Sequence, residues 1–524
     1  MKKYILAICV IFSCFTLHGF AQPPLVLMTL SAHPDDEDGA ALAYYGQLKG
    51  VKTYSVFYTR GEGGQNEIGS ALGEELGILR ANETRQAGAI LGSDVIFLGF
   101  PDFGFSKTAK ETFSFWGGHD SVLARLVYAI RAFKPDIIIT NHDTITTKPS
   151  RQHGNHQAVG ITAFEAFQKA ADASYHPEQL QGNITVWQVK KLFYRYFNRG
   201  GAPKDSLVTI DVTQHVPNGK TVEQVAIDAL SKHRSQGMDK FTLDSIPTFF
   251  RKHLYYKLRS DDNYTFDSTE LFSGLKPVER LSLQANSIVF QQVLLPKHQA
   301  QDAKSISAII GSDIHIGLVA TYDSTLRQTL QEYHIDYELI DSAMLASGTL
   351  NTFTTILLDL RTYEYRSDAV QYNAALLSYV NDGGNVVCFY HKPGDWNGKN
   401  FSPYAITLTS ERVTEEDAKV SLLNPNHILL QSPNRITEND WGGWVQERNI
   451  YLPSDDTIKT SSRYERLLSM SDTDDRQPST SLLYAMYGKG SYTYVSLALY
   501  RQLRNNNNGA IKLFFNLISQ NREK

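Results

Sequence analysis

Cysteine is almost absent from this sequence of 524 residues. The three cysteines are Cys9, Cys14 and Cys388, and the first two lie in an N-terminal segment with the pattern of a signal peptide. After cleavage of that segment one thiol would remain, which excludes an internal disulfide and a cysteine-based metal site. The folded protein must therefore rely on a large apolar core for its stability.

Long apolar runs are also missing. The compact apolar run at residues 4–17 follows the basic start "MKK", and it is shorter than the roughly 20 residues that span a bilayer. We therefore predict a signal peptide over residues 1–21, cleaved after Ala21, and an exported chain, periplasmic or secreted, with no stable membrane span. A membrane anchor or a buried helix is the alternative. Lipid attachment at Cys14 is a further one, although Phe12 fits a lipoprotein signal poorly.

The charge balance lacks any excess of positive charge. The formal net charge is −4 and the isoelectric point is about 6.4, which argues against a nucleic-acid partner. Hydrophobic residues make up 42% and aromatic residues 11% of the chain, which is typical of a globular protein. The length indicates more than one domain.

Short apolar segments alternate with helical ones from residue 25 to about 170. This alternation predicts an α/β domain whose parallel sheet is covered on both faces. A second α/β alternation begins near residue 305, whereas residues 400–480 are polar and predicted to be rich in loops. The predicted organisation is a first domain over residues 22–265, a connector over 266–304 and a second domain over 305–524.

Ionisable side chains are concentrated where two predicted strands end. The stretch "LMTLSAHPDDEDGA" opens as a buried strand and then presents His33, Asp35 and Asp36, while His153 and His156 begin a helix after the fourth strand. A hydrolytic zinc site needs three His or Asp/Glu ligands and one open position. Because parallel strands share their carboxyl edge, both groups are expected at one site. Solvated helix-capping residues are the alternative.

Five motifs together resemble one family. "AHPDDE" with the later H-x-x-H is similar to the PIG-L/LmbE-type zinc de-N-acetylases, which act on substrates that contain N-acetylglucosamine. The supporting matches are "TRGEGGQNEIG" (59–69), "LRANETRQAGAILG" (79–92), "LGFPDFG" (98–104) and "ALSKHRSQ" (229–236). The resemblance covers roughly residues 25–240, and it implies a Rossmann-like deacetylase domain.

The resemblance also implies roles for the residues that match the family motifs. One Zn²⁺, or another divalent ion, would be held by His33, Asp36 and His156. Asp35 would be the general base that deprotonates the attacking water. His153 would stabilise the oxyanion and protonate the leaving amine.

Two further residues, Arg80 and Asp102, match positions of the family that bind substrate or support the residues of the site. Asp102 follows a proline and could equally be a turn residue, and Arg80 could pair with a glutamate on its own helix. The H-x-x-H departs from the family pattern because its interior is Gly154-Asn155, where relatives often carry Pro-Asp.

The second domain resembles the flavodoxin/amidotransferase-like fold, in the ThuA-like branch of class I glutamine amidotransferases. "HIGLVATY" and "YVNDGGNVVCFYH" carry this weaker resemblance. Cys388 is the available nucleophile, but it lies inside a strand-like run without a glycine elbow, so we predict a non-catalytic domain. Trp396, Trp441 and Trp444 could stack on sugars or belong to the core.

These observations predict an exported zinc-dependent deacetylase that removes the acetyl group from an N-acetylated amino sugar in a carbohydrate or glycoconjugate. Two alternatives remain. One is a non-catalytic family member that binds metal or glycan, and the other is a zinc hydrolase of a different amide or ester. The oligomeric state stays open.

Overall fold

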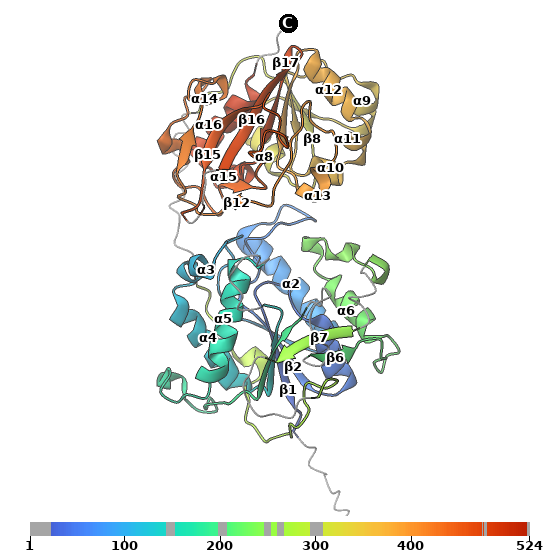
Figure 1. Ribbon diagram of the computed structural model, residues 1–524, viewed down its shortest axis with the longest axis vertical. Helices are drawn as coiled ribbons and strands as arrows, with labels where there is room; N and C mark the ends of the chain where they lie inside the picture. Colours follow the sequence, from blue (N-terminus) through green and yellow to red (C-terminus); the bar gives the residue numbers. More distant parts are fainter. Residues whose placement is uncertain are drawn as a thin grey trace, which may run out of the picture.

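The structure is a computed structural model that describes residues 23–142, 152–196, 207–245, 253–258, 267–293, 308–473, 475 and 479–520. It contains two α/β domains, each built around its own sheet (Figure 1). The predicted α/β class is confirmed. The signal peptide predicted over residues 1–21 lies outside the described residues. In the described part of the chain, no helix has the length and apolar character needed to span a membrane.

The first sheet has seven strands in the order β3-β2-β1-β4-β5-β7-β6. The first five positions in that order are parallel, and β7 runs antiparallel to both of its neighbours. The strands are β1 (Val26–Ser31), β2 (Lys52–Phe57), β3 (Asp94–Phe97), β4 (Ile137–Thr140), β5 (Lys191–Arg195), β6 (Val208–Asp211) and β7 (His253–Leu258). All residues of β1 and β4 are buried, as expected for central parallel strands covered on both faces.

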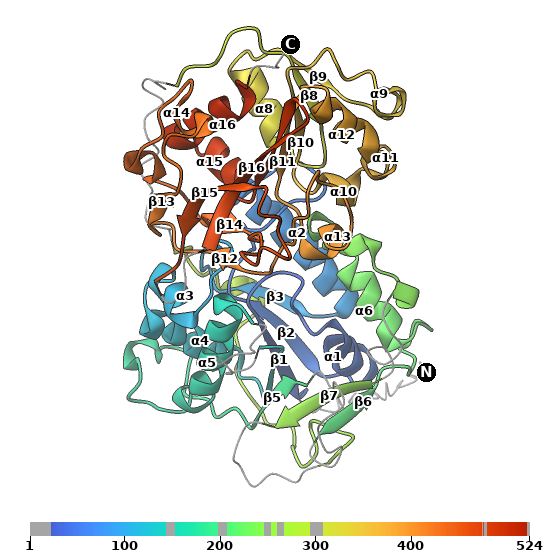
Figure 2. The ribbon, with the colours of Figure 1, turned by 45° about the horizontal axis from the view of Figure 1, so that its top comes forward.

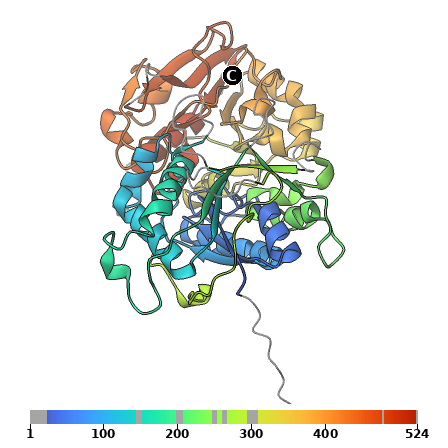
Figure 3. The ribbon, with the colours of Figure 1, turned by 60° about the horizontal axis from the view of Figure 1, so that its bottom comes forward.

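Helices cover both faces of this sheet (Figure 3). They are α1 (Gly39–Ala43), which continues as the π-helix η1 (Tyr44–Leu48), α2 (Gly73–Leu91), α3 (Ala109–Phe115), α4 (His119–Phe133), α5 (Gly154–Lys169) and α6 (Val222–Leu230). One core cluster joins α4 and α5 to residues such as Met28, and a second joins α1, α2 and α6 to residues such as Leu27. Successive residues of β1 thus serve opposite faces.

The second sheet has eight strands in the order β13-β15-β16-β17-β11-β10-β8-β9. They are β8 (Ile316–Val319), β9 (Tyr337–Leu339), β10 (Thr355–Leu358), β11 (Asn385–Phe389), β13 (Val420–Leu422), β15 (Glu465–Met470), β16 (Ser479–Tyr487) and β17 (Gly490–Val495); the short β12 (Arg412–Val413) and β14 (Asn449–Ile450) pair separately. Strands β17 to β9 are parallel, and the other three pair antiparallel. Residues 400–480 therefore contain strands as well as the predicted loops.

The helices of the second domain are α8 (Thr325–Glu332), α9 (Ser342–Ser347), α10 (Thr362–Tyr365), α11 (Ser367–Gln371), α12 (Asn373–Asn381), α13 (Pro393–Trp396), α14 (Ile428–Gln431), α15 (Leu499–Arg504) and α16 (Asn508–Ile518). Trp396, Trp441 and Trp444 are at most 5% exposed, so they belong to the core and do not offer stacking surfaces.

The second domain lies against the carboxyl edge of the first sheet (Figure 2). Arg361 donates to Gln65 at 2.9 Å, and Lys107 donates to Asp475 at 2.9 Å. Both first-domain residues belong to loops that follow the strands β2 and β3. The contacts place the second domain over the edge where the predicted site residues emerge.

Candidate metal centre

The His-Pro-Asp-Asp segment forms a tight turn directly after β1. The backbone N–H of Asp36 donates to the carbonyl of His33 at 3.2 Å, with Pro34 at the second turn position. Asp35 occupies the third position with φ 89°, where a type II turn favours glycine. Holding a non-glycine residue there costs about 1 kcal/mol. A carboxylate at a strained position indicates a functional requirement for that side chain.

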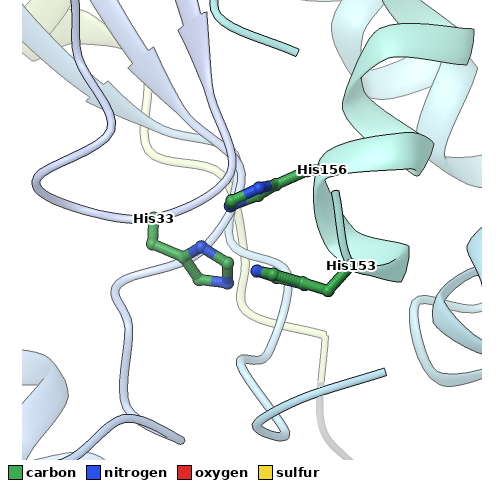
Figure 4. A group of neighbouring side chains, drawn as sticks. All are labelled: His33, His153 and His156. Atoms are coloured by element: carbon green, nitrogen blue, oxygen red, sulfur yellow. The ribbon is translucent and has the colours of Figure 1, made fainter. Parts of the chain in front are cut away.

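Imidazole and carboxylate donors converge beside this turn. Asp36 Oδ2 lies 3.1 Å from His33 Nδ1 and 3.3 Å from His156 Nε2. Figure 4 shows the rings of His33, His153 and His156 gathered between the loop after β1 and the start of α5. Two overlapping groups each bring one donor atom per residue within 4.8 Å: His33, His153 and His156, and Asp36, His142 and His156. His33 belongs to the first group, Asp36 to the second and His156 to both, so neither group contains all three predicted ligands.

The donors fit a divalent metal ion. Ligand atoms on a tetrahedral zinc lie about 3.3 Å apart, close to both distances measured from Asp36 Oδ2. His156 Nε2 is buried and makes no hydrogen bond, which is costly unless another partner is bound. Burial favours the neutral form of Asp36, but the neighbouring imidazoles of His156 and His33 outweigh it and hold the pKa of this carboxyl well below its usual value. A His/Asp/His group that could bind a metal is therefore present.

The second nitrogen of His33 faces Asn155 and Asp102. His33 Nε2 lies 3.1 Å from Asn155 Nδ2 and 3.8 Å from Asp102 Oδ1. Burial lowers the pKa of His33, but the carboxylates of Asp102 and Asp36 outweigh it and raise the pKa above its usual value. A carboxylate in the position of Asp102 orients a histidine ligand by accepting its second N–H. Asp102 is 5% exposed, and its predicted contact with substrate remains a prediction.

The packing around Gly154 and Asn155 explains why these two residues occupy the interior of the H-x-x-H. A Cβ on Gly154 would lie 2.2 Å from the carbonyl oxygen of Thr108, so only glycine fits this backbone contact. Asn155 is fully buried, and its Oδ1 accepts hydrogen bonds from Ser106 and Thr112. The sequence motifs predicted no role for Asn155, although its place between the two histidines was the available signal.

Arg80 supports the turn and the glycine-rich loop. It is 3% exposed, and it donates to the carbonyls of Gly61 at 2.9 Å and Pro34 at 2.7 Å. Its Nη2 also lies 3.5 Å from Asp35 Oδ2. Burial raises the pKa of Asp35 to about 6, although the Arg80 charge opposes the shift. The geometry assigns Arg80 a positioning role, and a substrate contact remains a prediction.

Glu37 and His233 form a buried pair behind the turn. His233 Nε2 lies 2.7 Å from Glu37 Oε1, and Glu37 Oε2 accepts the N–H of Asp35 at 2.9 Å. Two residues later, Ser235 donates to Glu83 on α2. The late "ALSKHRSQ" motif, whose His233 lies 196 residues after Glu37, thus ties the turn to α2.

His142 and His153 complete the cluster of imidazoles. His142 Nε2 accepts the N–H of Ala32 at 3.2 Å, which occupies its lone pair and supports a structural role. Its ring stacks on His156 with centroids 4.2 Å apart. Burial lowers the pKa of His153 well below its usual value. His153 Nδ1 is buried without a hydrogen-bond partner.

Cys388 has the properties of a core residue. It lies within β11, is fully buried, and burial raises the pKa of its thiol to about 12. The nearby His391 Nδ1 donates to the carbonyl of Phe389 at 2.8 Å, so it cannot act as a base for the thiol. These features agree with a non-catalytic second domain, whose resemblance to amidotransferases stays a prediction.

Residues 28–167 match the family model PIG-L, described as GlcNAc-PI de-N-acetylase. No curated protein matches the chain. Similar solved structures include an N,N′-diacetylchitobiose deacetylase from Pyrococcus horikoshii, with 18% identity over 45% of this chain and 83% of that chain at a TM-score of 0.34.

Two further structures have comparable scores. A 4-carboxy-2-hydroxymuconate hydratase from Pseudomonas putida has 16% identity over 46% of this chain and 100% of that chain, with a TM-score of 0.30. A deacetylase of the pseudoaglycone of the antimicrobial reagent A40926 has 13% identity over 44% of this chain and 96% of that chain, with a TM-score of 0.29. The assignment of a PIG-L family domain to residues 28–167 rests on the family match.

Proposed function

We propose that the protein is a metal-dependent deacetylase that hydrolyses the N-acetyl group of an amino sugar in a carbohydrate or glycoconjugate. The observation that carries this proposal is the convergence of His33 and His156 on Asp36, at 3.1 Å and 3.3 Å, from separate loops. The match of residues 28–167 to a de-N-acetylase family supports the reaction class.

In this proposal His33, Asp36 and His156 hold one divalent ion, with zinc the ion that best suits two imidazoles and a carboxylate. The bound ion would polarise the amide carbonyl and lower the pKa of a water molecule. The N-terminal segment is outside the described residues, and export to the periplasm or the medium is part of the same proposal.

Two side chains of this protein would perform the proton transfers. Asp35 would accept a proton from the attacking water, because it is the neighbour of the proposed ligand Asp36 in the turn that follows β1. His153, whose ring centroid lies 3.9 Å from that of His156, would donate a hydrogen bond to the carbonyl oxygen. Burial lowers the pKa of His153 in the free protein, so it would be protonated only when the negative charge of the developing oxyanion faces it, and it would then give that proton to the leaving amine. Water attack and amine protonation together give acetate and a free amino sugar.

Acetate release from a panel of N-acetylated amino sugars tests this function. The full chain loaded with zinc should release acetate. The isosteric Asp35→Asn variant should lose about 100-fold or more of the rate while it still binds zinc. A non-catalytic binder would release none, and release only from other amides or esters would show a different hydrolase.

A further inference from the structure

A cavity of about 370 Å³ lies between the two domains. Its first-domain wall is the glycine-rich loop 62–66, and its second-domain wall includes Tyr322, Gln446, Tyr500 and Arg501. We call it the interdomain cavity. Its volume is in the range of sites that bind small molecules.

The cavity lies where the ligand-binding edges of both sheets meet. The loop 62–66 follows β2, and Tyr322 follows β8 at the carboxyl edge of the second sheet. β8 pairs with β9 on one side and with β10 on the other, so the order of the parallel strands reverses at this point. Ligands of α/β proteins bind at such reversals.

One loop segment separates the cavity from the candidate metal centre. A Cβ on Gly63 would lie 2.6 Å from the carbonyl oxygen of Asp102, and Asp102 Oδ1 lies 3.8 Å from His33 Nε2. On the cavity side, Arg501 donates to the carbonyl of Gly63 at 3.3 Å. The cavity and the candidate metal centre therefore lie on the two sides of the contact between Gly63 and Asp102.

The charges in the cavity wall are already paired. Arg501 lies 3.5 Å from Glu447, and Arg504 forms an ion pair with Asp323. These arginines are therefore poorly placed to bind a phosphate. The aliphatic side chains among the described lining residues are Leu72 and Val445, too few to hold an acyl chain.

Gln446 has unsatisfied hydrogen-bonding capacity in this wall. Its Oε1 is buried without a partner, and its backbone has φ 64°, a strained value for a non-glycine residue. The rings of Tyr322 and Tyr500 flank the same space. Amide groups and tyrosine rings are suited to a neutral group that carries many hydroxyls.

We propose that the interdomain cavity is a subsite for a neutral, hydroxyl-rich unit of the substrate, such as a second sugar, and that Gln446 determines specificity for it. The inference rests on the proposed function, and it gives the second domain a direct part in substrate recognition.

Saccharide affinity tests the subsite. Calorimetry would compare N-acetylglucosamine with N,N′-diacetylchitobiose on the zinc-loaded full chain carrying Asp35→Asn, so that turnover does not intervene. The disaccharide should bind about five-fold more tightly. Adding Gln446→Gly should reduce this ratio to about one, because glycine accepts φ 64° without strain and removes only the side chain. Gln446→Asn, which shortens the amide, should also reduce it.

The matched control is Gln371→Ala on the exposed surface of α11, which should keep the ratio. An unchanged ratio in both Gln446 variants would overturn the inference, as would a chain that binds neither saccharide or prefers the monosaccharide. Acetate release by the chain with native Asp35 tests the proposed function separately. If the chain releases acetate but its affinity ratio does not depend on Gln446, the proposed function is supported and the subsite is contradicted.

Discussion

Replacing Asp35 with glycine should abolish acetate release without weakening the fold. Asp35 has φ 89° in the turn that follows β1. Relief of this strain contributes about 1 kcal/mol in favour of glycine. The carboxylate has one weak ion pair to lose, 3.5 Å from Arg80, and Arg80 keeps its bonds to two backbone carbonyls. The free energy of unfolding should therefore be unchanged or rise by up to about 1 kcal/mol.

Asp35→Ala is the matched control for this experiment. It also removes the carboxylate but keeps a Cβ, so it should be inactive and about 1 kcal/mol less stable than Asp35→Gly. Urea denaturation of the chelator-treated proteins measures stability without a contribution from metal binding. If the glycine variant unfolds more easily than the alanine variant, the backbone at this position is not strained. If it still releases acetate, Asp35 is not the base.

Three further outcomes are expected. Asp102→Ala should weaken metal affinity about 10–100-fold, because it removes the carboxylate 3.8 Å from His33 Nε2 that can accept the second N–H of a ligand histidine, and competition with a chelator measures the change. Gly154→Ala should destabilise the protein by about 2 kcal/mol, because its Cβ would clash with Thr108; thermal unfolding would show no shift if the contact is not this close. Cys388→Ala should keep full acetate release, and the native thiol should not react with a thiol reagent; rapid reaction would contradict its burial.

The alternation of strands and helices was enough to predict the shared edge of the first sheet. His33 follows β1, and His153 and His156 follow β4, the neighbour of β1, so strand order alone brings them close together. The strand β16 was not predicted, because its burial does not follow the strict alternation that marks a half-buried strand.

Contacts between distant segments were beyond the reach of local patterns. Glu37 forms a hydrogen bond with His233, which lies 196 residues later in the chain. Arg501 of the second domain donates to the backbone carbonyl of Gly63 in the first domain. The positive φ of Asp35 could not be predicted either. Pro34 predicts a turn, but it does not show that Asp35 occupies the turn position that favours glycine.

Anomalous diffraction at the zinc edge, from crystals of the zinc-loaded full chain, tests the central claim most directly. We expect one strong peak within about 2.1 Å of donor atoms from His33, Asp36 and His156. A peak elsewhere, or no peak in protein that releases acetate, would contradict the assignment of these three ligands.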